Sequence, residues 1–296
     1  MIKRSFFQSK YLPYLLIFPQ IAITLTFFYW PAIQGMIQSM LLSDPFGRQS
    51  KFVWFYNYIE LFTDPLYLQS IFTTLTFSIA VAAVSLSLGL FIATMANRAL
   101  KGKAIVRTML IWPYAVAPAI SGIMWLFLLH PSYGVVALAM KKWLGVDWNP
   151  VLEGNDAMVM IIMASAWKQI SYNFVFFMAG LQAIPKSLIE AAAMDGASPF
   201  RRFVTITMPL LTPTFFFLSV MNIIYSFFET FGIIHTVTQG GPGGSTNILV
   251  YKVYQDGFVG LNLGSSAAQS VVLMSLIIFI TILQFKFVEK KVQYTG

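Results

Sequence analysis

The most constraining feature of this sequence is a series of apolar runs, each long enough to cross a lipid bilayer. One of them, SIFTTLTFSIAVAAVSLSLGLFIATMAN, covers residues 70–97 without a charged residue. A helix of about 20 residues spans the hydrocarbon core of a bilayer. Because a backbone in hydrocarbon must satisfy its own hydrogen bonds, such runs predict transmembrane helices. They lack the polar and apolar alternation that is typical of outer-membrane strands.

Six such spans are predicted along the chain. They cover residues 12–33, 70–97, 106–129, 157–184, 208–234 and 266–288. The fold class is therefore an all-α polytopic membrane protein, with a six-span domain over residues 12–288, an N-terminal segment over 1–11 and a C-terminal tail over 289–296. Pro113 and Pro118 interrupt the third span and predict a kink there.

The basic residues follow the topology of these spans. If the N-terminus is cytoplasmic, thirteen of the nineteen Lys and Arg residues lie in inner segments or at inner span ends, and five lie in outer loops. The positive-inside rule then predicts that both termini are cytoplasmic. The net charge of +8 is explained by this distribution, so we expect membrane lipid as a partner and no nucleic acid.

Several chemistries are excluded by residues that the sequence lacks. It contains no cysteine, so it has no disulfide, thiolate metal site or cysteine nucleophile. No G-x-x-x-x-G-K-[ST] loop and no catalytic constellation occurs. We therefore expect a protein that is not an enzyme, binds no metal or cofactor, and depends on a partner for any energy from ATP.

Polar residues interrupt the fourth span at the stretch SAWKQISYN. Lys168 lies near the middle of the span, and Gln169, Tyr172 and Asn173 lie on or beside the same helical face. A charge at this depth costs about 3 kcal/mol or more, so it should face protein or water. This edge either lines a translocation path, or Lys168 pairs with Glu229 or with carbonyls at a helix end.

The fifth span carries a second polar stripe. Asn222, Tyr225 and Glu229 recur at i, i+3 and i+7 and share one helical face. They are candidates for the lining of the same path. Alternatively, such side chains form hydrogen bonds between helices of the bundle.

The inner loop between the fourth and fifth spans, IPKSLIEAAAMDGASPFRRFVTITMPLL, has the pattern of a helix, a turn and a second helix. Pro185 ends the fourth span, and the Ser187 to Glu190 spacing predicts a capping box for a new helix. Gly196 is the predicted stop of this helix. Ser198 and Pro199 are placed to begin the next one. Residues 185–209 are therefore expected to project into the cytoplasm.

This loop resembles the EAA loop of permease subunits of ATP-binding-cassette importers. The matching positions are Glu190, Ala191, Ala192, Gly196, Ile206, Met208 and Pro209. Met208 stands where leucine is usual. The stretches LPYLLIFPQ, WPYAVAPA, WKQISYNF, TQGGP and SSAAQSVVLM resemble the permeases of sn-glycerol-3-phosphate importers, so the resemblance covers nearly the whole chain.

The resemblance implies a type I, MetI-like permease core in the bacterial inner membrane that works by alternating access. It implies three kinds of partner: a second, similar permease subunit, two ATPase subunits that bind ATP and Mg²⁺, and a periplasmic binding protein. It also implies a phosphorylated glycerol derivative as cargo. The residues expected to couple the chain to the ATPase are Glu190, Ala191, Ala192, Asp195, Gly196 and Arg201.

If the polar edge of the fourth span lines the path, Lys168 is expected to attract the phosphate of this cargo, and Tyr172 or Asn173 to bond its hydroxyl groups. Two other functions stay open: a permease subunit of a related sugar or oligosaccharide importer, and a secondary transporter that works alone. A secondary transporter would be expected to show repeated halves, and no convincing repeat relates the first three spans to the last three.

Overall fold

The computed structural model describes residues 11–44, 50–98 and 103–287. Residues 1–10 and 289–296, predicted to be cytoplasmic, lie outside the described residues. The chain forms two compact units, which are described separately. Residues 1–63 with 253–272 make the first unit, and residues 64–252 with 273–296 make the second.

The first unit begins with one long apolar helix. It consists of α1 (Leu12–Thr24), a π-helical turn (Leu25–Tyr29) and α2 (Trp30–Gln38). It continues five residues beyond the predicted end at 33. No described side chain from Leu12 to Gln38 is buried, which is the pattern of a helix whose surface is covered by lipid or by another chain.

A small structure that the sequence analysis did not predict follows this helix. Strands β1 (Leu41–Ser43) and β2 (Ser50–Phe52) pair antiparallel, with Leu41 opposite Phe52. Helix α3 (Tyr56–Thr63) then places the buried Asn57, whose amide nitrogen donates to the carbonyls of Ser39 (2.8 Å) and Leu41 (3.0 Å). Asn57 thereby ties α3 to the C-cap of α2 and to the first residue of β1.

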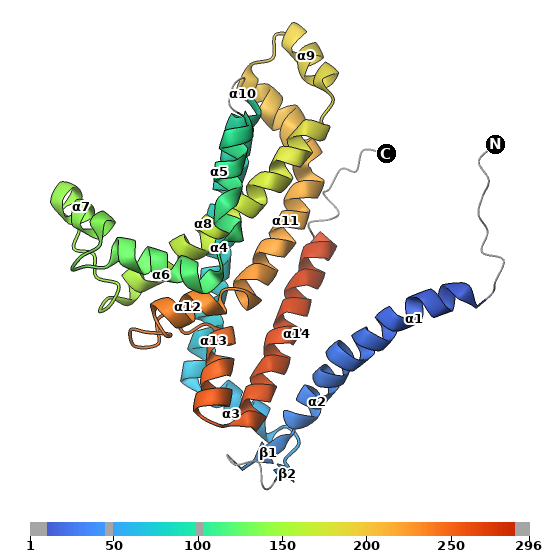
Figure 1. The fold of residues 1–296 in the computed structure, drawn as a ribbon, viewed down its shortest axis with the longest axis vertical. Helices are drawn as coiled ribbons and strands as arrows, with labels where there is room; N and C mark the ends of the chain where they lie inside the picture. The colour runs from blue at the N-terminus through green and yellow to red at the C-terminus, as the bar shows by residue number, and fades with distance from the viewer. Residues whose placement is uncertain (1–10, 45–49, 99–102, 288–296) are drawn as a thin grey trace. The chain divides into compact units, whose positions relative to one another are not determined.

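The second unit is a bundle built around three long helices. They are α4 (Pro65–Arg98), α8 (Gly154–Ala183) and α11 (Met208–Phe228), each of which contacts the other two (Figure 1). Their shared core contains Leu86, Phe174, Phe177, Leu211 and Leu218. A Cβ atom at Gly89 would lie 2.7 Å from Cβ of Asn173. Glycine at this position is what allows α4 and α8 to approach closely.

The third span is broken, more sharply than a proline kink alone predicts. Helix α5 (Lys103–Ala115) ends, and α6 (Pro118–Leu129) leaves it at 106°. Beyond the break, α6 packs on α12 (Phe231–Val237). Thr236 Oγ1 donates to the carbonyl of Ala119 at 3.3 Å. Helix α7 (Val135–Leu144) follows α6 and ends at Gly145, whose φ of +64° favours glycine.

The fourth and fifth spans are joined by the predicted helix, turn and helix. Helix α9 (Lys186–Met194) turns away from α8 by 66°. The short α10 (Pro199–Arg202) continues through a π-helical turn (Phe203–Thr207) into α11. In Figure 1, α9 and α10 lie at one end of the second unit, where they form the projection.

The predicted end of the fifth span at residue 234 is wrong. Helix α11 ends at Phe228, and the amide of Glu229 closes its last turn on the carbonyl of Tyr225 at 2.9 Å. The chain then forms α12, the glycine-rich turn of residues 238–248, α13 (Leu249–Tyr254) and a π-helical turn (Gln255–Val259).

The last helix, α14 (Leu263–Phe287), contributes to both units. Four helical stretches, at residues 12–38, 65–97, 199–228 and 263–286, are long and apolar enough to cross a membrane on their own. The pairs α5–α6 and α8–α9 pass the same test as bent pairs. Counting each pair as one span gives the six that the hydropathy pattern predicts.

Candidate functional site

The turn between α9 and α10 is a Schellman motif built on Gly196. The amide of Gly196 donates to the carbonyl of Ala193 (3.1 Å), and the amide of Ala197 donates to that of Ala192 (3.0 Å). These two bonds satisfy carbonyls that the helix end would otherwise leave open. Gly196 has a φ of +76°, in the left-handed region. The predicted helix stop at Gly196 is confirmed.

The two helices of the projection begin differently. Ser198 Oγ accepts a hydrogen bond from the amide of Arg201 at 3.3 Å, so Ser198 caps α10 as predicted. The predicted capping box of α9 is wrong: in the described part of the loop, Pro185 is the N-cap and no side chain caps this helix. The helix begins one residue before Ser187, at Lys186, so the Ser187 hydroxyl lies inside the first turn.

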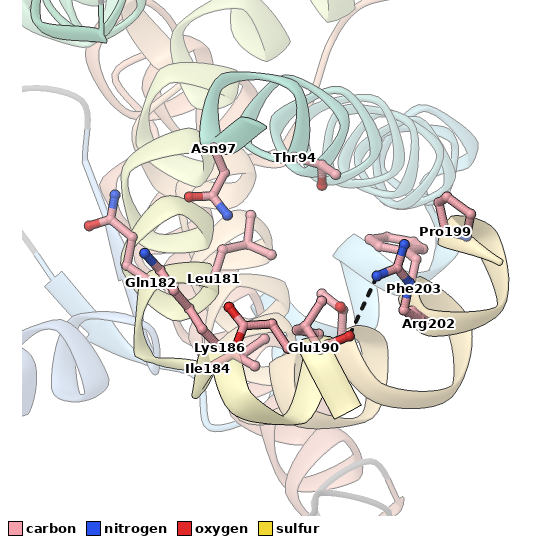
Figure 2. A pocket seen from close by; sticks show the side chains of 12 residues that line it. Thr94, Asn97, Leu181, Gln182, Ile184, Lys186, Glu190, Pro199, Arg202 and Phe203 are labelled. Atoms are coloured by element: carbon pink, nitrogen blue, oxygen red, sulfur yellow. Dashed lines mark hydrogen bonds between the residues drawn. The ribbon is translucent and has the colours of Figure 1, made fainter. Parts of the chain in front are cut away.

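A cavity of about 550 Å³ opens between the projection and the ends of α4 and α8. Figure 2 shows Lys186, Glu190 and Arg202 around it, with Asn97 and Gln182 from the longer helices. Arg202 Nη1 donates to the carbonyl of Ile189 at 3.4 Å. This bond joins α10 to α9, so the projection is a folded unit with its own internal contact.

The coupling residues predicted from the sequence all lie on this projection. Glu190, Ala191, Asp195, Gly196 and Arg201 are exposed, and Ala192 is half-buried. Two residues that the sequence analysis did not single out are also exposed: Met194 at 89% and Phe200 at 77%. The sequence could have indicated them, because both are large apolar residues in a loop predicted to face water, which is typical of an interaction site.

Lys168 is buried and bonded to backbone carbonyls. Its side chain is 5% exposed. The ammonium donates to the carbonyl of Tyr114 at 3.3 Å and also to that of Val116, and it lies 6.0 Å from the centroid of the Tyr114 ring. No ion pair joins it to Glu229 within the described residues. Of the alternatives left open by the sequence, the contacts of Lys168 in this conformation match the third, bonding to carbonyls at a helix end.

The break in the third span explains why these carbonyls need a donor. In a continuous helix, the carbonyl of Tyr114 would accept from the amide of residue 118, which is a proline and has none. The last carbonyls of α5 therefore lack helical partners. A buried carbonyl without a partner costs about 1–3 kcal/mol. A cation at the carbonyl end of a helix is also favoured by the helix dipole.

Asn173 and Asn222 pair with each other between α8 and α11. Each amide nitrogen donates to the oxygen of the other, at 3.2 and 2.8 Å. Ser85 Oγ of α4 donates to Asn222 Oδ1 at 2.7 Å, so the network joins all three long helices. Tyr225 is also buried, and its hydroxyl donates to the carbonyl of Ser165 at 3.3 Å.

The remaining path candidates differ in exposure. Gln169 is buried. Tyr172 is half-buried and packs against Tyr114 and Phe176, with ring centroids at 5.5 and 4.7 Å. Glu229 is exposed, because it stands at the end of α11 and not inside a span. Of the seven candidates, Tyr172 and Glu229 are thus the two whose side chains are not buried in this conformation.

No metal-binding cluster is found among the residues that the structure describes: no three His, Asp or Glu side chains gather where they could hold an ion. The polar groups described above bond mainly to one another and to the backbone. Chemically, this arrangement offers contacts and positioning, with no assembled set of acid, base and nucleophile.

Long apolar helices, a broken span and a folded projection between two spans define a polytopic helical membrane protein of the transporter type. The chain matches the family described as "binding-protein-dependent transport system inner membrane component" over residues 85–294. It belongs to this family. It is therefore a transport subunit and a multi-pass inner membrane protein.

Curated relatives resemble the chain over its whole length. It is 56% identical over 293 residues to the sn-glycerol-3-phosphate transport system permease protein UgpA of Rhizobium meliloti (strain 1021), covering 99% of this chain and 100% of the relative. It is 55% identical over 289 residues to the protein of the same name from Brucella abortus biovar 1 (strain 9-941), covering 98% of each.

Solved structures share the fold. A bacterial alginate ABC transporter in complex with an alginate pentasaccharide-bound periplasmic protein superposes with a TM-score of 0.83 at 20% identity, covering 97% of this chain and 96% of that one. The MetNI methionine ABC transporter in an inward-facing conformation superposes with a TM-score of 0.55 at 17% identity, covering 77% and 97%. The predicted MetI-like permease fold is confirmed.

Proposed function

We propose that this chain is the permease subunit of an ATP-driven importer that carries sn-glycerol-3-phosphate across the bacterial inner membrane by alternating access. The observation that carries the proposal is the identity of 56% to a permease named for this cargo, with 99% of one chain and 100% of the other covered. Because the match covers 99% of this chain, it includes the helices that carry the path candidates and the projection.

The complex would contain a second, similar permease, two ATPase subunits and a periplasmic binding protein. The family description, which names dependence on a binding protein, supports the last of these partners. ATP and Mg²⁺ would bind at the ATPase subunits, because this sequence has no phosphate-binding loop. The chain itself would catalyse no reaction and hold no cofactor.

The distribution of Lys and Arg supports an orientation with both termini in the cytoplasm. Residues 185–209 then face the cytoplasm, as the ATPase subunits do. We propose that Glu190, Ala191, Ala192, Asp195, Gly196 and Arg201 form or shape the contact with the ATPase. The exposed Met194 and Phe200 would supply the apolar part of that contact, since Met and aromatic side chains are enriched at protein interfaces.

The path candidates would divide into two roles. Tyr172 and Glu229, the accessible pair, are proposed to meet the cargo, with oxygen atoms that can bond its hydroxyl groups. Lys168, Gln169, Asn173, Asn222 and Tyr225 would form the wall behind them, since their side chains are buried in this conformation.

The cargo is tested with the reconstituted complex and its cognate binding protein. We expect uptake of radiolabelled sn-glycerol-3-phosphate and stimulation of ATP hydrolysis by the loaded binding protein. Glycerophosphodiesters and maltose serve as competitors. Uptake of maltose but not sn-glycerol-3-phosphate would instead indicate a sugar importer, and uptake that continues without the ATPase subunits would indicate a secondary transporter.

The two cargo contacts are tested by Tyr172→Phe and Glu229→Gln. Each should lower uptake about tenfold while the complex still assembles. Lys142→Met, which changes an exposed lysine of α7, is the matched control and should transport normally. Normal uptake by both path variants would remove Tyr172 and Glu229 from the path.

A further inference from the structure

The break in the third span is held by two adjacent residues of α8. We propose that Trp167 and Lys168 form a clamp, called here the break clamp, that fixes the angle between α5 and α6. The broken span then turns with α8 as one body. Both residues are positioning residues in this proposal, because they act through the backbone and rings of the third span.

Lys168 holds the end of α5. Its ammonium donates to the carbonyls of Tyr114 and Val116, on either side of the last helical residue, Ala115. Pro118 cannot supply the amide that would have paired with Tyr114. A cation from α8 therefore replaces a bond that the chain's own helix has lost.

Trp167 holds both arms of the break with one ring. Its centroid lies 5.8 Å from that of Trp112 in α5 and 6.3 Å from that of Trp125 in α6, and both ring pairs are inclined at 74°. Edge-to-face contact of this kind is a favoured geometry for aromatic pairs. A change in the angle between α5 and α6 would have to separate at least one of these pairs.

The break clamp lies between the projection and the helices beyond the break. At its C-terminal end, α8 passes through Ile184 and Pro185 directly into α9. Beyond the break, α6 is joined to α12 by the bond between Thr236 and Ala119. Gly122 strengthens this contact, because a Cβ there would lie 2.5 Å from Thr236 Oγ1. Movement of α9 that tilts α8 would thus carry α6 and α12 with it.

The clamp is distinct from a cargo contact. The Lys168 side chain is buried and already donates to two carbonyls. The proposed function matters only for what the clamp does during transport, which is to make α6 and α12 move with α8. The geometry of the clamp does not depend on which cargo is carried. It can therefore be tested without cargo.

The test uses the absence of cysteine in this chain. Spin labels are placed at Ile123→Cys in α6 and Val175→Cys in α8, both exposed positions, in the full complex with cysteine-free partner subunits. The distance between the labels is measured without nucleotide and with ATP. We expect one narrow distribution in both states for the otherwise unchanged chain and for Lys168→Arg. Lys168→Met and Trp167→Leu should broaden it about twofold or more.

Two results overturn the proposal. One is a distance that changes between the two states in the otherwise unchanged chain, which would make the break a hinge. The other is a narrow, unaltered distribution in Lys168→Met. If Lys168→Met fails to assemble, Trp167→Leu decides by the same criterion, because it removes ring contacts and leaves the Lys168 bonds in place.

Transport kinetics separate a clamp from a cargo ligand. For Lys168→Met we expect a maximal uptake rate lowered about tenfold, with the KM for sn-glycerol-3-phosphate within about twofold of the original. A KM raised about tenfold with an intact distance distribution would overturn the proposal and assign Lys168 to the cargo. Failure of the whole complex to import this cargo, with the distances as expected, would contradict the proposed cargo and leave the clamp standing.

Discussion

Asn173 of α8 and Asn222 of α11 exchange hydrogen bonds through their side-chain amides, 49 residues apart in the sequence and with neither side chain exposed. Ser85 of α4 joins the same network. The network therefore adds polar contacts among all three helices to their apolar packing and fixes their register. The side chains of Ser85, Asn173 and Asn222 thus help to hold the bundle together.

Replacing Asn222 with leucine should destabilise the bundle by about 1–2 kcal/mol, because Ser85 and Asn173 lose their shared partner inside the membrane. The measurement is the thermal stability of the purified complex. Ser219→Ala is the control and should be nearly neutral, since among the described residues Ser219 bonds only the carbonyl of Phe215 in its own helix. Equal stability of the two variants would contradict a structural role for the network.

Glycine at position 89 should be required for the close approach of α4 and α8. Gly89→Val places its first side-chain carbon 2.7 Å from Cβ of Asn173, and overpacking of this kind costs about 1–3 kcal/mol. The melting temperature of the complex should fall accordingly. Ala83→Val adds a similar volume at an exposed position of the same helix and should leave the melting temperature nearly unchanged. A Gly89→Val complex as stable as this control would mean that the helices can separate without cost.

Gly196→Val should weaken association with the ATPase subunits. The left-handed backbone at Gly196 costs roughly 1–2 kcal/mol for other residues, and no described atom lies within 4 Å of an added Cβ. Strain, and not a clash, is therefore the expected cause. Association is measured by co-purification of the ATPase subunits.

Gly145→Val is the matched control for this experiment. Gly145 also has a positive φ, of +64°, and open space around it, but it ends α7. It should be strained equally and still associate with the ATPase. If both variants lose association, general instability is the cause, and the turn at Gly196 has no special role in coupling.

The two serines of the projection should respond to alanine with effects of different size. Ser198→Ala removes the cap of α10 and should cost about 1 kcal/mol, seen as faster hydrogen exchange of the amides after the Gly196 turn. Ser187→Ala should change exchange little, because α9 begins without a side-chain cap in the described loop. A larger effect of Ser187→Ala than of Ser198→Ala would indicate that α9 has the capping box that the sequence predicts.

The fold was predictable where one physical requirement decides the structure. Hydrocarbon requires helices, so the spans followed from hydropathy, and the positive φ at Gly196 followed from a glycine after a run of helix formers. The bend of 106° between α5 and α6 could not be predicted. Pro113 and Pro118 mark where the helix is weak, but the angle depends on Trp167 and Lys168, which lie about fifty residues away in the sequence.

The candidate site was predictable only as a set of residues. A polar stripe in a membrane helix is expected if the helix lines a water-filled path, and equally if it forms hydrogen bonds to other helices. The pattern alone therefore cannot distinguish these two roles. The pairing of Asn173 with Asn222 needs the register of two helices, which no local pattern contains. Glu229 was placed inside a span because the apolar residues after it continue the hydropathy signal into α12.

The length of α8 sets the scale of the movements it can produce. Lys168 lies fifteen residues from the last residue of the helix, Ala183, which is about 22 Å at 1.5 Å per residue. A tilt of about 10° at the projection would therefore displace the ammonium by about 4 Å, more than the length of a hydrogen bond. A lever of this length converts a small rotation at one face of the membrane into a displacement at its centre large enough to open or close a passage for a small molecule.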